Sequence, residues 1–570
     1  MGRSGHRRGL GSECPSHLPT VLAVAAILLL SLGPTDSFAP LSAGHAATRR
    51  KGGVGAQRGA SQEWRGTSTG ISRELGGVAR LSGVAEEQAV EAVVHSTKDS
   101  VSVSNNDMKP FVVVPRRDPR VWFDSIRAVA GARPDALVEL SKAGEAQLES
   151  LALPIRKHEP YRYTDLESLY RTDFESGPAE GAGSDGTAAA AISPYLLKES
   201  EGQQMVFVNG VFSTALSDIS ALGGVEGLVA GNVGGMEGAQ LDQVREIMAF
   251  LPETDADFRT TQGSLAFCSL NQACFADAGV IVVEDGVRIE KPIQVIFFSD
   301  GLEGPTVSHP RLVVKAGKDS HVSFTQSYLS QGGVCLANGF TRILVGDRAN
   351  VEHDYLEEMA GDDRMVDTVS VDQAVNSTYS INQVLAGGFD ARSNVQIDLL
   401  DSGSHCNVYT AALTTKNQRQ DVHTTIRHMA RGTTCTQEQR NVVADTADCV
   451  FKGRIVIDQI AQKTAAEQLC RTLLVSDKAR VTVMPSMEII ANDVTCTHGA
   501  TVCDMEDEEL FYLMTRGISK IQAKTLVIKS FADIVVKRFM DPTLRERLTE
   551  KLLAAAPRED RAVKGIFQSI

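Results

Sequence analysis

The sequence predicts a mainly β protein whose central part is a β-solenoid, a coiled stack of short strands, between helical segments. From about residue 280 to 500, short runs rich in Val and Ile alternate with Gly, Asp, Asn and Ser turns. A pattern of turn residues and valines recurs in this region. Segments with helical spacing precede and follow it.

The recurring pattern is a Gly or Ser turn residue, a small residue three positions later and a valine five positions later. Its anchors are Gly317, Ser320 and Val322; Gly346, Ala349 and Val351; Gly403, Cys406 and Val408; and Ser476, Ala479 and Val481. A solenoid needs such residues because one rung cannot bury its apolar side alone. The spacing is irregular, and a β-sandwich also uses short strands and turns, so the pattern leaves that alternative open.

Composition divides the chain into five parts. They are a signal plus transit peptide (residues 1–80), a polar or disordered segment (81–118), an N-terminal helical domain (119–200), a β-helix core (201–503) and a C-terminal helical domain (504–570).

Residues 1–80 have the features of a targeting sequence. GHRRGL supplies positive charge, VLAVAAILLLSLG is too short to span a bilayer comfortably, and PTDSFAP marks a processing point. Residues 41–80 hold seven Lys and Arg against two Glu, as transit peptides do. The signal peptide and the transit segment meet near Phe38. This arrangement resembles the bipartite leader of algae with complex plastids and predicts a location in the plastid stroma. A single membrane anchor is the alternative.

The N-terminal helical domain begins with an amphipathic segment. Trp122, Ile126 and Val129 fall on one helix face before a break at Pro134. Residues 177–193 are rich in Gly and Ala and predict a linker or surface loop.

The C-terminal part returns to helix. DEELFYLMTRG has helical spacing, with Gly517 as its expected stop. Ser519 predicts the cap of SKIQAKTLVIKSFADIVVKRF, and Asp541 or Thr543 begins a last helix. Most wide apolar stripes of this kind pack on their own domain, and a partner-facing surface is the alternative.

Charge and motifs exclude several functions. The chain has a formal charge of −14, and because residues 1–80 hold 10 Lys and Arg against 4 Asp and Glu, the remainder carries −20. An acidic body argues against nucleic acid or anionic lipid as a main partner. The phosphate loop, the GxSxG elbow and HExxH are missing from the sequence. Nothing after the leader is apolar enough to cross a membrane.

Cysteine and histidine remain as candidate ligands. Ten scattered cysteines without a CxxC pair indicate reduced thiols and argue against a zinc ribbon. Cys470, Cys496, His498 and Cys503 occupy successive strand-like segments, and thiolate and imidazole are ligands for iron and iron–sulfur clusters. Strands of neighbouring rungs lie about 4.7–4.9 Å apart, so Cys470 is expected beside Cys496 or His498. A buried free cysteine is otherwise a small hydrophobe, the reading we favour for Cys503 and Cys406.

An ordered set of motifs resembles the SufD family of the SUF iron–sulfur cluster assembly machinery over about residues 120–545. The motifs are YRYTDLESL, VFVNG, SLNQACFADAGVIV, SHPRLVV, VFKGRIVIDQIAQKTAAEQ, NDVTCTHGATV and EELFYLMTRGI. The resemblance implies a right-handed parallel β-helix flanked by helical domains. It also implies a non-catalytic scaffold subunit that pairs with a SufB-like paralogue and docks a SufC-like ATPase through its C-terminal helices.

The resemblance further implies site residues. His498, in the HGAT motif, would take part in assembling a transient iron–sulfur cluster at the interface with the paralogue, with Cys470 and Cys496 as further candidates. A flavin in the complex has been suggested for the family. The expected partner-binding residues are Phe511, Tyr512, Arg516, Lys524 and Phe531.

Two departures qualify the resemblance. Cys470 stands where SufB proteins carry a cysteine important for assembly and SufD proteins more often carry a polar residue. Gly499 replaces the acid of the SufB motif HEAT, which sorts the chain with SufD. A SufB-type scaffold in its own right and a solenoid carbohydrate-active enzyme are the alternative functions.

Overall fold

A computed structural model describes the part of the chain that begins at residue 117 and ends at residue 554. Within this part, the residues left out are 132, 178–185, 252–263, 302–303 and 506. The predicted leader and nearly all of the predicted polar segment therefore lie outside the described residues.

The described chain begins with two helices separated at the predicted break. Helix α2 (Pro119–Ala128) starts at Asp118, whose carboxylate accepts a hydrogen bond from the backbone N–H of Arg120. Helix α3 (Asp135–Ser150) starts after Pro134. Trp122 and Ile126 are fully buried, as predicted for the apolar face of α2.

Short helices and strands follow before the regular solenoid. They are α4 (Leu166–Tyr170), β1 (Glu175–Ser176), α5 (Thr187–Ile192), β2 (Gln204–Val208), β3 (Val211–Phe212), β4 (Leu228–Asn232), α6 (Gly238–Met248) and α7 (Leu265–Cys274). Helix α5 lies inside the segment for which a linker or loop was predicted. Its TAAAAI sequence has high helix propensity, and Ala188 and Ile192 are buried against Val206 and Ile296.

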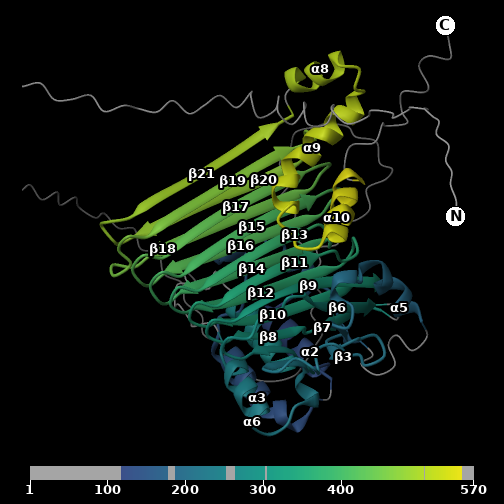
Figure 1. Ribbon diagram of the computed structural model, residues 1–570. Coiled ribbons are helices and arrows are strands. Elements are labelled where there is room, and N and C mark those ends of the chain that lie inside the picture. Colours follow the sequence, from purple (N-terminus) through teal and green to yellow (C-terminus); the bar gives the residue numbers. More distant parts are fainter. Residues whose placement is uncertain are drawn as a thin grey trace, which may run out of the picture. The chain divides into compact units, whose positions relative to one another are not determined.

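The centre of the structure is a parallel β-solenoid of about eight turns, which confirms the predicted fold class (Figure 1). Its strands are β5 (Gly279–Val283), β6 (Ile293–Gly301), β7 (Thr306–Ser308), β8 (Arg311–Ala316), β9 (His321–Gly332), β10 (Cys335–Val345), β11 (Asn350–Glu357), β12 (Arg364–Gln373), β13 (Thr378–Leu385), β14 (Asp390–Leu399), β15 (His405–Thr414), β16 (Arg419–His428), β17 (Thr434–Val443), β18 (Asp448–Ile457), β19 (Ala465–Leu474), β20 (Arg480–Ile489) and β21 (Thr495–Asp504). From β8 onward, even-numbered strands form one sheet and odd-numbered strands the other.

The valines of the recurring pattern face the interior, but they do not form one column. Val322 and Val351 are in-register neighbours on β9 and β11. On β15, the residue in the same column as Val322 and Val351 is Cys406. Val408 lies two residues further along that strand. All four of these side chains are fully buried. The pattern therefore predicted the inward face but not the register.

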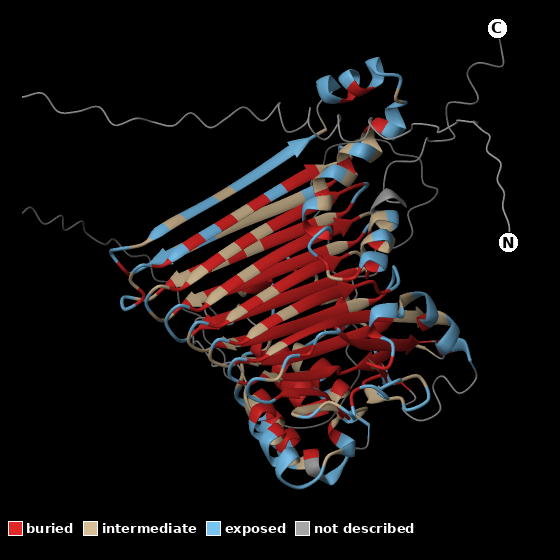
Figure 2. Ribbon diagram, viewed as in Figure 1, coloured by how far each residue is buried: buried red, intermediate tan, exposed pale blue. Residues whose placement is uncertain are grey.

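The two ends of the solenoid differ. At the first end, β3 pairs antiparallel with β2 and β4 with β5, and Leu222 from the loop between them is buried in the interior. At the other end, β20 and β21 are the outermost strands of their sheets. Figure 2 shows the change from buried strands in the body to the exposed strand β21.

The C-terminal helices are α8 (Asp507–Thr515), α9 (Lys520–Val536) and α10 (Pro542–Ala554). The predicted cap and stop are confirmed, because Ser519 forms a capping box and Gly517 has a φ of 84°. Helix α9 packs on β13, β15 and β17 through buried residues that include Ile528 and Val535. The carboxylate of Glu358 in the solenoid forms ion pairs with Arg547 and Lys551 of α10. No described helix has the length and hydropathy needed to cross a bilayer.

Candidate functional site at the open end of the solenoid

The predicted cluster ligands lie on the last two strands of one sheet. In β19, the buried residues Ala466, Gln468, Cys470 and Thr472 alternate with side chains that are mostly exposed, so these four face the interior. Their in-register partners on β21 are Cys496, His498, Ala500 and Val502. The inward face of the last rung therefore carries Cys496 and His498.

These two residues are accessible because no further rung of the described chain covers them. His498 is exposed, and Cys496 is half-buried and packs against the end of the core cluster. An inward position in an earlier rung is sealed, as Gln468 shows with 1% exposure. The open end thus brings an imidazole and a thiol to a surface that a second protein can reach.

Cys470 occupies a different environment. It is fully buried, and burial raises the pKa of its thiol to about 12. The side-chain amide of Asn441 lies 3.6 Å from its sulfur as a donor. Its in-register neighbour is Ala500, whereas Cys496 lies four positions away along β21. The expected adjacency of Cys470 and Cys496 is therefore wrong, and His498 is only a diagonal neighbour of Cys470.

Cys503 and Cys406 lie in different environments. Cys503 is exposed on the outward face of β21, with its sulfur 3.5 Å from the carbonyl oxygen of Thr472, so its interpretation as a buried small hydrophobe is wrong. Cys406 is sealed in the interior beside Cys435, its in-register neighbour.

Sequence reasoning did not single out Cys435. The pKa of the Cys435 thiol is lowered by a hydrogen bond with Cys406 and by His428, whose Nε2 lies 3.2 Å from the Cys435 sulfur. Burial raises the pKa of Cys406. The separation of 29 residues between the two cysteines equals one turn at this level and is the signal that could have identified the pair.

The expected partner-binding residues fall on two surfaces. Phe511 and Tyr512 on α8 are 68% and 42% exposed, and the Arg516 guanidinium lies 5.2 Å from the Tyr512 ring centroid. Lys524 on α9 is half-buried. Phe531 turns toward the solenoid, where Arg440 lies 5.1 Å from its ring centroid. Of these five residues, only Phe511 and Tyr512 present exposed aromatic side chains.

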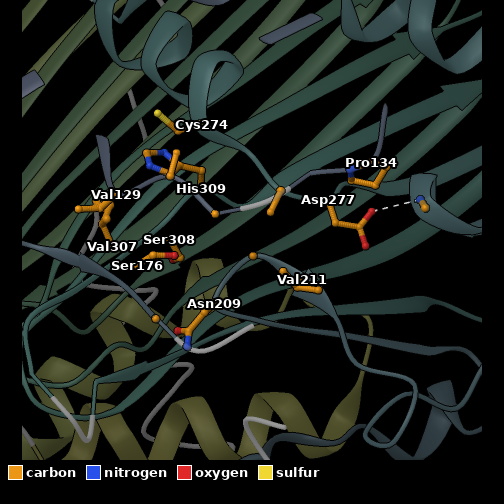
Figure 3. Close-up of a pocket in the computed structure, with 16 residues that line it drawn as sticks. Val129, Pro134, Ser176, Asn209, Val211, Cys274, Asp277, Val307, Ser308 and His309 are labelled. Carbon is orange, nitrogen blue, oxygen red and sulfur yellow. Dashed lines mark hydrogen bonds between the residues drawn. The ribbon is translucent and has the colours of Figure 1, made fainter. Parts of the chain in front are cut away.

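A cavity of about 460 Å³ lies near the first end of the solenoid (Figure 3). The side chains of Asn209, Cys274, Asp277 and His309 line it, and no predicted site residue does. The Asp277 carboxylate is occupied by structural hydrogen bonds, among them one of 2.8 Å from the Asn232 amide. Among the described residues that line the cavity, none is Lys, Arg, Phe, Tyr or Trp. The lining thus offers a flavin neither a cationic nor an aromatic side chain, and the flavin stays a prediction from the resemblance.

Comparison with known protein families agrees with the fold and the ordered motifs. The model of the SUF system FeS cluster assembly SufBD core domain matches residues 297–531, and that of the SufBD protein N-terminal region matches residues 123–295.

Individual relatives agree with this assignment over most of their own length. An iron–sulfur cluster assembly SufBD family protein of Synechocystis is 27% identical over 74% of this chain and 92% of its own. The iron–sulfur cluster assembly protein SufD of Escherichia coli is 27% identical over 71% and 90%. The chloroplastic protein ABCI7 of Arabidopsis thaliana is 26% identical over 79% and 92%. The chain thus belongs to the SufBD family of the SUF iron–sulfur cluster assembly system and is a member of the SufD type.

Proposed function

We propose that this chain is a non-catalytic scaffold subunit that pairs with a SufB-type paralogue through its open solenoid end. The observation that carries the proposal is the unprotected edge of β21. Between Thr495 and Cys503 this strand has no Lys, Arg, Asp, Glu or Pro. Among the described residues, only β19 pairs with it. Natural proteins protect long edge strands with such residues or cover them, and a second solenoid would supply the cover by adding a strand.

The inward-facing side chains at the open end also support the proposal that a partner covers this surface. Val483 and Met487 of β20 are only partly buried, and Ile489 and Val502 are 44% and 47% exposed. Contiguous apolar side chains of this kind are uncommon on the surface of a monomer and are typical of interfaces. A paralogue built from the same rung pattern would bury them.

Pairing through this end would place His498 and Cys496 at the interface, where the cluster is the cargo of the complex. We propose that His498 binds iron of the growing cluster or handles a proton during assembly, and that Cys496 supplies a thiol. A free ring nitrogen and a thiolate are required for iron to bind, so assembly is expected to be sensitive to pH. Because Cys470 is sealed and protonated, its participation would require the interface to open the last rung.

The C-terminal helices would dock the SufC-type ATPase. Phe511, Tyr512 and Met514 of α8 are exposed, while α9 and α10 are anchored on the solenoid. Apolar and aromatic side chains of this kind are the usual anchors of interfaces. An ATPase that holds α8 could transmit its motion through α9 to the strands on which α9 packs.

We further propose a plastid location. The relative from Arabidopsis is named chloroplastic, and the N-terminal 80 residues have the composition of a signal plus transit peptide. A fluorescent protein fused behind these residues should enter the stroma of an alga with a complex plastid. Retention at a membrane would contradict the proposal.

The decisive experiment uses the complex reconstituted with its paralogue and ATPase. His498→Ala should reduce cluster formation, followed by visible absorption, by about tenfold or more, the loss expected when an essential ligand or its support is removed. The subunits should still co-purify, because the substitution leaves the edge of β21 intact. Thr497→Ala, one residue away and facing outward, is the matched control. Unchanged cluster formation with His498→Ala would remove the proposed role.

A further inference from the structure

The interior beneath His498 contains a column of amide side chains. In the odd-numbered sheet, Val408, Gln437, Gln468 and His498 are successive in-register neighbours on β15, β17, β19 and β21. The two glutamines are each 1% exposed. The column is therefore apolar at Val408 and becomes polar over the two rungs that precede the exposed histidine.

The Gln468 amide group donates a hydrogen bond to the preceding rung. Its Nε2 donates to Oε1 of Gln437 at 2.8 Å, and Nε2 of Gln437 donates to Oγ1 of Thr424 at 2.6 Å. Gly453 of the facing sheet leaves the necessary space, because a Cβ there would lie 2.4 Å from Nε2 of Gln468. This donor chain runs away from the open end and leaves Oε1 of Gln468 for another partner.

Among the described residues, Oε1 of Gln468 has no hydrogen-bond partner. A buried carbonyl oxygen without a donor is unfavourable, because its lost hydration is not replaced. The next rung offers one group that can donate at this column. His498 faces the same side at about 4.7–4.9 Å, the usual separation of neighbouring strands. Its ring is accessible and can rotate about two side-chain bonds.

We propose that Gln468 is the positioning residue of His498: its Oε1 accepts a hydrogen bond from one ring N–H and directs the other ring nitrogen out of the open end. Ligating histidines generally have such an acceptor, which fixes the tautomer and the ring orientation. The hydrogen bond itself is independent of the proposed function. Its use, to present a lone pair to cluster iron or to a proton, rests on that function.

The proposal is tested on the full chain by nuclear magnetic resonance with ¹⁵N-labelled histidine, with His498→Ala used to assign the signal. The wild type should show a ring N–H of His498 that is protected from exchange with water. Gln468→Met removes the acceptor and should speed this exchange by about tenfold or more. Gln468→Glu keeps an acceptor oxygen and, with its carboxyl group protonated, a donor to Oε1 of Gln437, so it should restore the protection.

The matched control is Gln439→Met, which changes a buried glutamine of the preceding odd-numbered strand whose in-register neighbour is Cys470. It should leave the His498 signal unchanged. Should Gln468→Met fail to fold, as judged by circular dichroism, Gln437→Met carries the same test. It frees the Gln468 amide to rotate and should also speed the exchange.

An unprotected ring N–H in the wild type, or unchanged protection in the folded variants, would overturn the positioning role. Neither result would affect the role of His498 in cluster assembly, which His498→Ala tests separately. Conversely, normal assembly by His498→Ala would remove the functional use of the hydrogen bond, while the exchange measurement would still report whether it forms.

Discussion

The two ends of the solenoid solve the same physical problem in opposite ways. At the first end, antiparallel pairs β2–β3 and β4–β5 finish the sheets, and Leu222 is buried in the interior. At the other end, β21 presents its edge and its inward face to solvent. A solenoid that folds alone needs a cap at each end, because each rung is buried only by its neighbours. Among the described residues no further element caps this end, so a partner is expected there.

One column shows how closely exposure depends on the next rung. Cys406, Cys435, Ala466 and Cys496 are successive neighbours on the odd-numbered strands. The first three are at most 3% exposed, whereas Cys496 is half-buried. The same side-chain direction thus produces a core position in the body and a surface position in the last rung.

Large-to-small substitutions should reveal the largest difference between the two ends in their contribution to the free energy of unfolding. Phe207 at the first end is 1% exposed and packs against Phe212 and Phe297, with ring centroids 5.4 and 5.3 Å away. Phe207→Ala should lower the free energy of unfolding by about 3–5 kcal/mol, because it leaves a cavity. Val502→Ala at the open end should lower it by less than about 1 kcal/mol. Urea denaturation measures both values, and equal losses would contradict the comparison.

A buried carboxylate makes the sealed body sensitive to pH. Asp367 is fully buried and accepts hydrogen bonds of 2.9 Å from the hydroxyls of Tyr328 and Tyr355. Burial raises its pKa from 3.8 to about 6. The folded state therefore binds the proton more tightly than the unfolded state, and this contribution to stability is present below about pH 4 and lost as pH rises through about 6.

Asp367→Asn should remove this dependence. The difference in unfolding free energy between wild type and variant should change by about 2–3 kcal/mol between pH 4 and 7, in the direction that favours the variant at higher pH. Denaturation series at several pH values measure it, and Asp477→Asn, at an exposed turn, is the control. A constant difference over this range would show that Asp367 is charged throughout.

The sequence contained enough information for the solenoid but not for its register. Val and Ile runs and turn residues identified the rungs, because inward apolar positions and turns are local features. Register depends on turn lengths, which vary: Thr434 lies 29 residues after His405, Ala465 lies 31 after Thr434, and Thr495 lies 30 after Ala465. A change of one or two residues moves every later pair.

This variation explains the errors at the candidate site. The sequence identified His498 and Cys496 through their motif, and the structure places them together on one strand. It could not show that Ala500 lies beside Cys470, nor that Gln468 lies beneath His498, since both depend on the lengths of β20 and of the two turns that connect β19 to β21. The helix α5 was missed for a different reason: its few alanines are flanked by glycines that dominate the local composition.

The smallest expected effect on the isolated chain is also the most direct test of the open end. Ala500 faces inward on β21 and is exposed, so Ala500→Lys places a charge on this edge without opening the rung below. The free energy of unfolding should change by no more than about 0.5 kcal/mol, as for an ordinary surface substitution. Association with the SufB-type paralogue should weaken by about tenfold or more, or about 1.4 kcal/mol, because the ammonium group would be buried without a partner. Isothermal titration calorimetry measures the affinity, and Ala500→Ser controls for the loss of the alanine. Unaltered affinity for Ala500→Lys would place the paralogue on another surface and leave the exposed edge of β21 without an explanation.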